Sequence, residues 1–418
     1  MVLIEIGLGL ILIASVPYII YLLGIFWGYK MTPIQRLMQF PYISIIISAY
    51  NESTVIKERI ENIAASQYLK GYYEIILVDD CSSDDTGSIA DKTLQSFSIP
   101  HTILTNKERL GTNRSYNRAI SLAKHNIIVT TDADVFFRQD SLDLLVSRLI
   151  SDDKIAAVCA DLRPNEDPNR ITGAESVYRK FYGTICDWES AHDSTYAFNG
   201  ALVAFKKNLV QRIEDGHGAD DANTAFESIR RGYRAVYEIN SIVYETLPKD
   251  ITSQFRQKTR RAKRLIEATL YNLDLLASKR PFAYFYFLRI WMYCISPVSY
   301  LIGSVAFMVG LILWNVWTII PIIAIIVLIL KSKRNIISAF TVSQIYLFSG
   351  ILHMGTNTKI WESTSKTSRA MICEPACIYW DRYDHGYGCL GWCIINDKPI
   401  VSGTLCNECK QKKLIRGY

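Results

Sequence analysis

Long apolar stretches at both ends of this chain contrast with a patterned middle. Residues 2–27 form an apolar run in which Glu5 is the only charged residue, and a run of this length can cross a bilayer as a helix. It lacks the basic start, the short apolar core and the small-residue cleavage site of a secretory signal. We therefore expect residues 1–29 to form an uncleaved transmembrane anchor.

A second apolar zone occupies residues 282–354. It divides into three expected spans, near 290–313, 316–330 and 336–354. The middle span is short, so two spans with a re-entrant segment are an alternative. Lys30 and Arg36 follow the first apolar run, and the positive-inside rule then places residues 30–280 on the cytoplasmic side.

The middle of the chain alternates short β-branched runs with helical patterns. Strands are predicted at 42–48, 74–78, 102–106 and 127–131, and helices at 52–66 and 112–124. Ser83 or Asp84 is the expected N-cap of a further helix after the second strand. Strands that alternate with helices indicate an α/β fold, with a mostly parallel sheet covered by helices on both faces.

Polar residues follow three of these strands. They are Tyr50, Asn51 and Glu52, then Asp79 and Asp80, and finally Asp132 and Asp134. In an open α/β sheet the ligand site lies beyond the carboxyl ends of the strands, so these side chains should meet in one crevice. Clustered carboxylates there predict a sugar, ribose, base edge or metal as ligand. No glycine-rich phosphate loop of either common pattern is present, which argues against a dinucleotide oxidoreductase or a P-loop enzyme.

The pair Asp132 and Asp134 predicts a cation site. Alternate residues of an extended chain point to the same side, so both carboxylates can present oxygens to one point. Two like charges held that close need a positive charge between them, and a divalent cation with oxygen ligands supplies it. The alternative is a polar turn that closes a strand, and this short segment alone does not decide between the two.

Charge adds one feature to this picture. The net charge is a modest +6, but residues 249–264 are strongly basic. Such a segment suits nucleic acid, an anionic membrane face or phosphate groups. Because the apolar zone begins nearby, at residue 282, we expect an amphipathic segment under the lipid headgroups and no nucleic-acid partner.

Six of the ten cysteines fall in residues 355–418. They are Cys373, Cys377, Cys389, Cys393, Cys406 and Cys409. Four thiolates would close a tetrahedral Zn²⁺ site, whereas an even set of cysteines suits disulfides in an oxidising compartment. The side of the membrane on which this Cys-rich tail lies decides between structural zinc and disulfides, and both interpretations stay open.

Seven motifs occur in a fixed order along the chain. They are IIISAYNE at 45–52, ILVDDCSSDDT at 76–86, GTNRSYNRAI at 111–120, TTDADVFF at 130–137, NGALVAFKK at 199–207, GADDANTAFESIRRGYRAVYE at 218–238 and QKTRRAKR at 257–264. In order and spacing they resemble the family 2 glycosyltransferases, inverting membrane-associated enzymes with a GT-A nucleotide-sugar domain. The resemblance covers residues 41–265, about half of the chain.

The resemblance implies a donor pocket and a metal site. Donor-binding residues are then expected at Ala49, Tyr50, Asn51, Glu52, Asp79, Asp80, Asn117 and Asp132. Asp132 and Asp134 resemble the family's DxD metal site, which implies Mg²⁺ or Mn²⁺ on the diphosphate of a UDP- or GDP-sugar. The cation would stabilise the leaving nucleoside diphosphate.

The resemblance also places the general base. Asp220 and Asp221 stand where the family has an acidic pair before a helix, and Asp221 lies eleven residues before Gly232. Asp221 is therefore expected to take the proton from the acceptor hydroxyl, with Asp220 beside it. The alternative is that both residues simply cap a helix, since Asp favours the first helical turn.

Contacts to the acceptor or the diphosphate are implied near the end of the domain. The residues are Asn199, Gly200, Gln257, Arg260 and Arg261. Gln257 and Arg260 resemble the family's QxxRW element, but Arg261 stands at the Trp position. That Trp borders the acceptor in processive synthases, so its absence argues against a long-chain polymerase. Thr112 is a second departure, at a position where many relatives have Lys.

The predicted fold class is α/β, a GT-A domain with a Rossmann-like mixed sheet, flanked by transmembrane helices and a Cys-rich tail. The expected regions are 1–29 (transmembrane helix), 40–248 (GT-A domain), 249–281 (basic interfacial helices), 282–354 (transmembrane region) and 355–418 (tail). The expected function is sugar transfer from a cytoplasmic nucleotide sugar to a lipid-linked or glycolipid acceptor by a multi-pass membrane enzyme. A processive polysaccharide synthase is the main alternative. A non-catalytic membrane scaffold would predict a damaged metal or base position.

Overall fold

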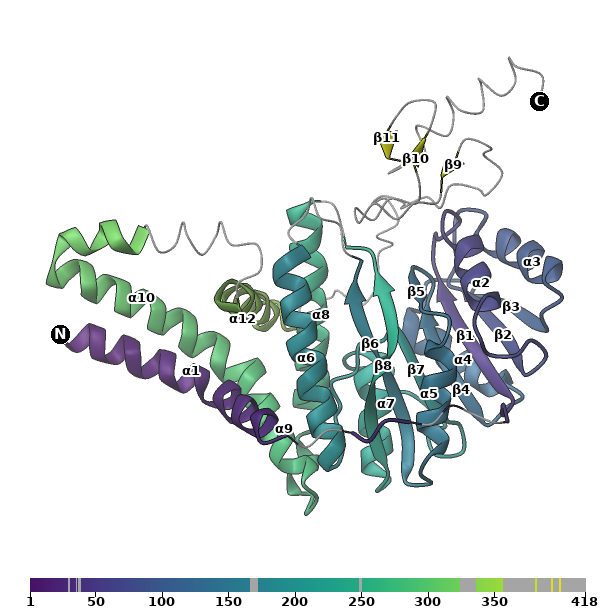
Figure 1. Ribbon diagram of the computed structural model, residues 1–418, viewed down its shortest axis with the longest axis horizontal. Helices are drawn as coiled ribbons and strands as arrows, with labels where there is room; N and C mark the ends of the chain where they lie inside the picture. The colour runs from purple at the N-terminus through teal and green to yellow at the C-terminus, as the bar shows by residue number, and fades with distance from the viewer. Residues whose placement is uncertain are drawn as a thin grey trace.

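A mixed sheet, its covering helices and a projecting helical arm make up the protein (Figure 1). The computed structural model describes residues 1–28, 31–34, 36, 39–165, 172–247, 250–323 and 336–355, together with the short strands β9 (Trp380–Asp381), β10 (Trp392–Cys393) and β11 (Lys398–Pro399). Except for Cys393, whose backbone lies in β10, the cysteines of the predicted zinc or disulfide tail lie outside the described residues. Both interpretations of the tail therefore stay predictions.

The main sheet has eight strands in the order β3-β2-β1-β4-β7-β6-β8-β5. Its strands are β1 (Ile43–Ala49), β2 (Tyr73–Asp79), β3 (His101–Thr105), β4 (Ile127–Asp132), β5 (Val135–Phe137), β6 (Ile155–Pro164), β7 (Leu202–Lys206) and β8 (Arg234–Glu245). The first four in spatial order are parallel, whereas β7 runs antiparallel to both β4 and β6. The carboxyl ends of β1, β2 and β4 consequently open at one edge of the sheet.

Helices cover both faces of this sheet. They are α2 (Ile56–Ala64), α3 (Thr86–Ser96), α4 (Thr112–Leu122), α5 (Ser141–Ile150), α6 (Thr172–His192), α7 (Asp220–Arg230) and α8 (Ile251–Tyr271). Ile46 of β1 belongs to one hydrophobic cluster, whereas its neighbours Ile45 and Ile47 belong to another. Successive residues of a strand point to opposite faces, so the isoleucine-rich strand packs a core on each side.

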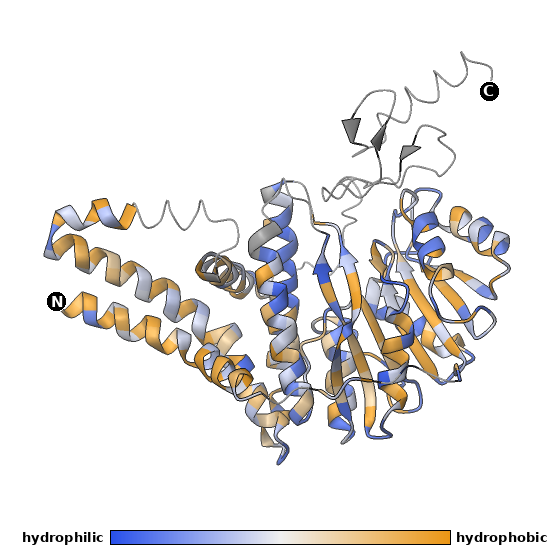
Figure 2. Cartoon of the chain, in the orientation of Figure 1, coloured by the Kyte–Doolittle hydropathy of each residue, from blue (hydrophilic) through white to orange (hydrophobic). Residues whose placement is uncertain are grey.

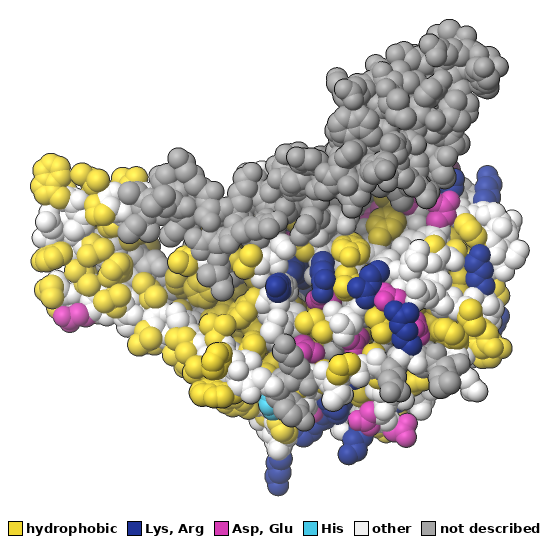
Figure 3. Space-filling model, in the orientation of Figure 1, with side chains coloured by type: hydrophobic (Ala, Val, Ile, Leu, Met, Phe, Trp, Pro, Cys, Tyr) yellow, Lys and Arg dark blue, Asp and Glu magenta, His cyan; other side chains and the backbone are white. Residues whose placement is uncertain are grey.

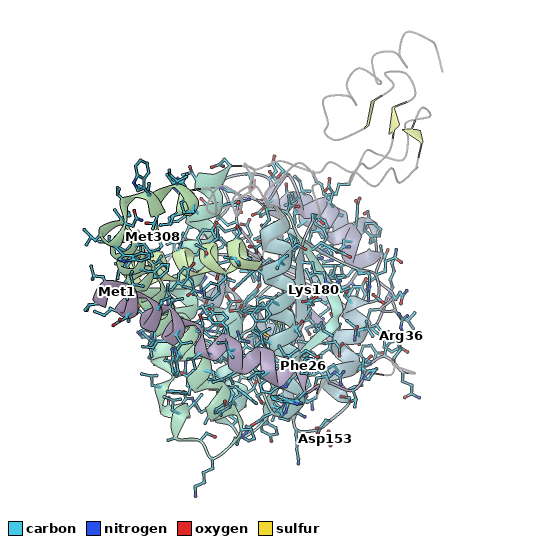
Figure 4. All side chains as sticks on the ribbon, turned by 60° about the vertical axis from the view of Figure 1, so that its left-hand side comes forward. Met1, Phe26, Arg36, Asp153, Lys180 and Met308 are labelled. Atoms are coloured by element: carbon cyan, nitrogen blue, oxygen red, sulfur yellow. The ribbon has the colours of Figure 1, made fainter. Side chains whose placement is uncertain are left out.

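Two apolar helices form the arm. Helix α1 (Val2–Phe26) packs against α10 (Ser296–Trp314), which follows α9 (Phe282–Ile290) and a π-helical turn at Trp291–Ile295. Met1 and Met308 lie at the same end of this pair, while Phe26 lies at the other end, beside the sheet domain (Figure 4). A Cβ atom on Gly303 would lie 2.8 Å from Leu10 Cβ, so small residues permit this close helix packing.

By length and composition, Val2–Phe26 and Phe282–Trp314 could each cross a membrane. Figure 2 shows that both are apolar along most of their length. Helix α12 (Ile336–Leu352) is a shorter apolar helix packed against α8 and α10. The expected first C-terminal span began at residue 290, but the helix already begins at Phe282. The middle span near 316–330 has a 3₁₀ turn at Val316–Thr318, and most of the remainder lies outside the described residues.

The predicted strands and helices agree with the structure to within a few residues. The predicted N-cap of the third helix is wrong. The cap residue of α3 is Asp85, and Asp84 instead accepts a hydrogen bond of 3.1 Å from the Thr86 backbone N–H. The preceding loop is one residue longer than the pattern indicated, because Asp84 also accepts from the Ser53 N–H of the neighbouring loop.

A buried ion pair connects the arm to the sheet domain. Arg289 of α9 donates two hydrogen bonds, of 2.7 and 2.9 Å, to the carboxylate of Glu189 on α6, and both side chains are 1% exposed. The Tyr21 hydroxyl of α1 donates to the same carboxylate. Three helices from distant parts of the chain therefore meet at Glu189.

We expect Glu189→Gln to lower the free energy of unfolding by about 3–5 kcal/mol, because it leaves the buried Arg289 charge without a carboxylate partner. Chemical unfolding in detergent measures the change. The matched control is Glu227→Gln, which breaks an ion pair with the partly exposed Arg231 and should cost less than about 1 kcal/mol. Equal effects from the two variants would contradict this role for Glu189.

Candidate active site

One cavity of about 290 Å³ opens at the carboxyl ends of β1, β2 and β4 and extends to α6, α7, α8 and α12. The predicted site residues that line it are Ala49, Tyr50, Asp80, Asp132, Asp134, Asn199, Gly200, Asp220, Asp221, Arg260 and Arg261. On the face where α8 adjoins the sheet, Lys and Arg side chains lie beside Asp and Glu (Figure 3). The fold thus places both carboxylate and guanidinium groups on the lining of this cavity.

Asp132 and Asp134 lie at the end of β4 and in the turn that leads into β5. Burial raises the pKa of Asp132 well above its usual value, and the neighbouring carboxylates of Asp134 and Asp220 raise it further. A cluster of carboxylates that repel one another in a buried place is electrostatically suited to a divalent cation.

The donor set also suits such a cation. Among the described residues, no group of three or more His, Cys, Asp and Glu side chains forms a complete metal cage. Mg²⁺ is commonly held by one or two carboxylates, with substrate phosphates and water as the other ligands. Asp132 and Asp134 therefore fit a metal that binds together with a diphosphate.

Asp220 and Asp221 occupy the first turn of α7. Burial raises the pKa of Asp221 to about 7, and the adjacent Asp220 carboxylate adds to this effect. Gly200 faces Asp221 in a left-handed conformation, with φ of 76°, and a Cβ atom on it would lie 3.4 Å from an Asp221 oxygen. Glycine therefore leaves one side of the carboxylate open, and a carboxylate that ionises near neutral pH suits general-base catalysis.

Helix α8 supplies cations to the other side of the cavity. Arg261 donates two hydrogen bonds to the Glu245 carboxylate, one of them 2.9 Å long. Arg260 pairs with no carboxylate among the described residues, and burial, followed by the nearby Arg261 and Arg264 charges, lowers its pKa to about 10. A partly buried guanidinium near Asp132 and Asp134 is a suitable partner for phosphate oxygens.

Asp80 and Arg109 shape the end of the cavity next to β1 and β2. Burial raises the pKa of Asp80, but hydrogen bonds from Asn106 and from the N–H groups of Leu110 and Gly111 outweigh it, so the pKa is lowered. The Arg109 guanidinium lies 3.3 Å from the centre of the Tyr50 ring. Asp80 thus fixes the loop at residues 109–111, and this loop places the Arg109 guanidinium over the Tyr50 ring beside the cavity.

The comparisons with known proteins agree with this geometry. The model of Glycosyl transferase family 2 matches residues 44–209, and the model of Glycosyl transferase family group 2 matches residues 127–330. Together they span the sheet, the acidic pairs and the basic helix α8. The chain belongs to the family 2 glycosyltransferases.

Relatives in this family are distant. The Staphylococcus aureus poly-beta-1,6-N-acetyl-D-glucosamine synthase is 24% identical over 227 residues, covering 53% of this chain and 54% of the relative. The probable glycosyltransferase YdaM of Bacillus subtilis is 25% identical over 242 residues, covering 55% of this chain and 56% of YdaM. The chain thus spans about half the length of the curated relatives it matches.

A solved structure shares the fold. Mannosyltransferase PcManGT from Pyrobaculum calidifontis, solved in complex with GDP-Man and Mn²⁺, superimposes with a TM-score of 0.74 at 24% identity. The match covers 85% of this chain and 99% of PcManGT. The predicted α/β class and GT-A fold are therefore confirmed.

Several residues suggested by the family resemblance do not line the cavity. They are Asn51, Glu52, Asp79, Asn117 and Gln257. Asn117 donates to the Ile213 carbonyl and accepts from the Ile213 N–H, both at 2.8 Å, so it fastens the loop before α7. Gln257 donates to Glu245 at 3.3 Å. Their contact with substrate stays a prediction, and in this structure they support the loops and helices around the site.

Arg59 of α2, whose side chain is fully buried, is a site residue that was not predicted from the sequence. Its guanidinium donates to the Thr131 hydroxyl at 2.7 Å and to the Asp132 carbonyl at 3.2 Å, and it lies 4.5 Å from the centre of the Phe137 ring. Burial lowers the Arg59 pKa to about 9, while the Asp132 and Asp134 charges oppose the shift. The sequence does contain a signal for it, because Arg59 stands among Ile56, Ile60 and Ile63 on the apolar face of the helix.

We expect Arg59→Lys to weaken Mn²⁺-dependent nucleotide binding by about tenfold, because lysine keeps the charge but cannot make both hydrogen bonds behind the DxD segment. Titration of Mn²⁺ at constant nucleotide measures this. The matched control, Lys57→Arg, changes an exposed side chain of the same helix and should leave binding unchanged. If both variants bind Mn²⁺ and nucleotide equally well, Arg59 does not position the metal site.

Proposed function

We propose that this protein is an inverting, metal-dependent glycosyltransferase at a membrane. It would transfer a sugar from a UDP- or GDP-sugar, held on the cytoplasmic side, to a lipid-linked or glycolipid acceptor. The observation that carries the proposal is the meeting of the Asp132–Asp134 segment, Asp221 and Arg260 in one cavity. These are a cation site, a base and an anion-binding group, the parts that a nucleotide-sugar transfer needs.

The chemistry follows from these parts. Asp221 removes the proton from the acceptor hydroxyl as that oxygen forms a bond to the anomeric carbon. The bond from that carbon to the diphosphate oxygen breaks, and the nucleoside diphosphate leaves with the electron pair. Mg²⁺ or Mn²⁺ would neutralise charge on the diphosphate when bound by Asp132 and Asp134. Arg260 adds a fixed positive charge on the opposite side.

The apolar helices α1 and α10 support a membrane location. Their exposed residues include Leu12, Val305 and Leu313, each more than half exposed to solvent in the isolated chain. Apolar side chains exposed on helices that are long enough to cross a bilayer suit contact with lipid. The number of spans and the side of the tail remain predictions, because residues 324–335 and most of 356–418 lie outside the described part of the chain.

A second candidate function is processive polysaccharide synthesis, favoured by the similarity to the poly-beta-1,6-N-acetyl-D-glucosamine synthase. Arg261 argues against it, because this residue occupies the QxxRW tryptophan position and is tied to Glu245. Its charged side chain replaces the flat apolar surface expected beside a growing polymer. Single transfer to a lipid-bound acceptor is therefore the preferred proposal.

The test uses the purified full chain in detergent with a membrane lipid extract and Mn²⁺. UDP-, GDP- and other nucleotide sugars are screened for release of nucleoside diphosphate, and the labelled product is analysed. A lipid product that has gained a single labelled sugar supports the proposal. A labelled polymer supports the synthase, and nucleotide binding without product from any donor would support a scaffold.

A further inference from the structure

The cavity has a second wall that the donor and catalytic residues do not explain. On the side of α6 and α12 it is lined by Tyr178 and Tyr182 of α6, Leu265 of α8 and Ala339, Val342 and Leu347 of α12, together with the ion-paired Glu175, Arg179 and Lys258. Most of these side chains are apolar or aromatic, in contrast to the carboxylates and arginines beside the sheet. This wall of the cavity therefore offers apolar and aromatic surface that neither the metal site nor the base requires.

Helix α12 separates this apolar end from the outer surface. Its cavity-lining residues Ala339, Val342 and Tyr346 recur at helical spacing on one face. Ile345 and Leu352, which do not line the cavity, are 40% and 66% exposed. One helix thus contacts the reaction cavity on one side and presents apolar side chains outward on another.

The position of α12 is fixed by close packing and hydrogen bonds. A Cβ atom on Gly350 would lie 2.9 Å from Ala262 Cβ, so α12 packs tightly against α8. Toward the arm, Gln344 donates to the Tyr18 hydroxyl of α1, and the hydroxyls of Tyr300 and Thr341 lie 2.8 Å apart. The apolar end of the cavity therefore lies within the same helical layer as α1 and α10.

The charged groups near this wall are already paired with one another. Glu175 of α6 accepts a hydrogen bond of 2.9 Å from Arg179 and another from Lys258 of α8. Glu245 accepts from Arg261. Cations that already pair with carboxylates are poor sites for a further anion. This wall therefore does not favour an anionic acceptor group such as a phosphate.

The general base points to the same class of acceptor. A phosphate oxyanion needs no proton removed before it attacks, whereas a hydroxyl does, and Asp221 provides for a hydroxyl. Tyr178 and Tyr346, which both line the cavity, offer aromatic surfaces of the kind that pack against sugar rings. The headgroup beside Asp221 is therefore best matched by a neutral sugar.

We propose that the groove between α6 and α12 binds the acceptor, a glycolipid whose neutral sugar hydroxyl faces Asp221 and whose apolar chain lies along Ala339, Val342 and Leu347. This inference rests on the proposed glycosyltransferase function. It adds that chain-bearing acceptors enter from the membrane layer through the side of the cavity.

The test compares two acceptors on the same enzyme, using the donor that the nucleotide-sugar screen identifies. Methyl glucoside carries the sugar without the chain, and dodecyl glucoside carries both. In the unaltered protein the KM for dodecyl glucoside should be far lower. Val342→Trp should reduce this preference about tenfold or more, because indole replaces several chain methylenes in the groove and each buried methylene is worth severalfold in affinity. Val342 lines the cavity and is 37% exposed, so a larger side chain at this position is not enclosed by core packing.

The matched control is Ile345→Trp, which makes the same addition on the outward face of α12 and should keep the preference unchanged. If Val342→Trp and Ile345→Trp show the same preference for dodecyl glucoside over methyl glucoside, the groove does not bind the acceptor's chain. A dodecyl phosphate that accepts the sugar better than dodecyl glucoside, and still does so in Asp221→Asn, would overturn the neutral headgroup. If the unaltered protein releases no nucleoside diphosphate with any donor, the proposed function fails first, and the groove as an acceptor site fails with it.

Discussion

Asp221→Asn is expected to lower the rate of sugar transfer by about 10²–10⁴-fold while nucleotide-sugar binding is retained. The amide has the shape of the carboxylate but cannot take a proton. Asp221 lies on the α7 side of the cavity, with Gly200 leaving room beside it. Its loss should therefore affect the reaction step and leave the donor contacts near Tyr50 and Arg109 in place.

The pH dependence provides the control for this variant. A carboxylate acts as a base only when ionised, and burial and Asp220 raise the pKa of Asp221 to about 7. The rate should consequently rise between about pH 6 and pH 8 as the carboxylate loses its proton. Asp221→Asn should lack this rise. A variant that keeps a third of the activity, or the same rise with pH, would show that another group is the base.

Asp134→Ala should lower Mn²⁺-dependent transfer by about 10²-fold or more, because it removes one of the two carboxylates that would bind the divalent cation on the diphosphate under the proposed function. The same loss should follow chelation of the metal in the unaltered protein. Added Mn²⁺ or Mg²⁺ should restore the unaltered protein and leave the variant inactive. Transfer rates measured against metal concentration, with nucleotide affinity from titration calorimetry, test both statements.

Asp85→Ala is the matched control for the metal site. Asp85 is exposed and makes no side-chain cap bond at the start of α3, so its loss should leave the metal dependence unchanged. Activity in Asp134→Ala that still requires Mn²⁺ with the same affinity would place the metal elsewhere. Activity in that variant without any metal would exclude metal-assisted departure of the nucleotide.

Local patterns in the sequence determined much of this protein. Alternating β-branched runs and helical segments predicted β1 to β4 to within a few residues, because these patterns record which side of each element is buried. The strands β5 to β8 were not predicted. The rule that ligands bind beyond the carboxyl ends of parallel strands places Tyr50, Asp80 and Asp132 in one crevice, and the structure has all three on one cavity. Length and apolar composition likewise predicted α1 and the helical stretch of α9 and α10 as candidate membrane helices.

The rest depended on contacts between distant parts of the chain. Arg59 and Asp132 are separated by 73 residues, and Arg289 and Glu189 by 100. No periodicity within either segment names the partner, because such pairs form only when separate helices and strands pack. The cavity wall of α6 and α12 has the same origin. The sequence thus determined the first four strands of the sheet and the acidic residues that follow three of them. Tertiary packing decided which charges are neutralised, which carboxylate stays open beside Gly200, and where an apolar chain can reach it.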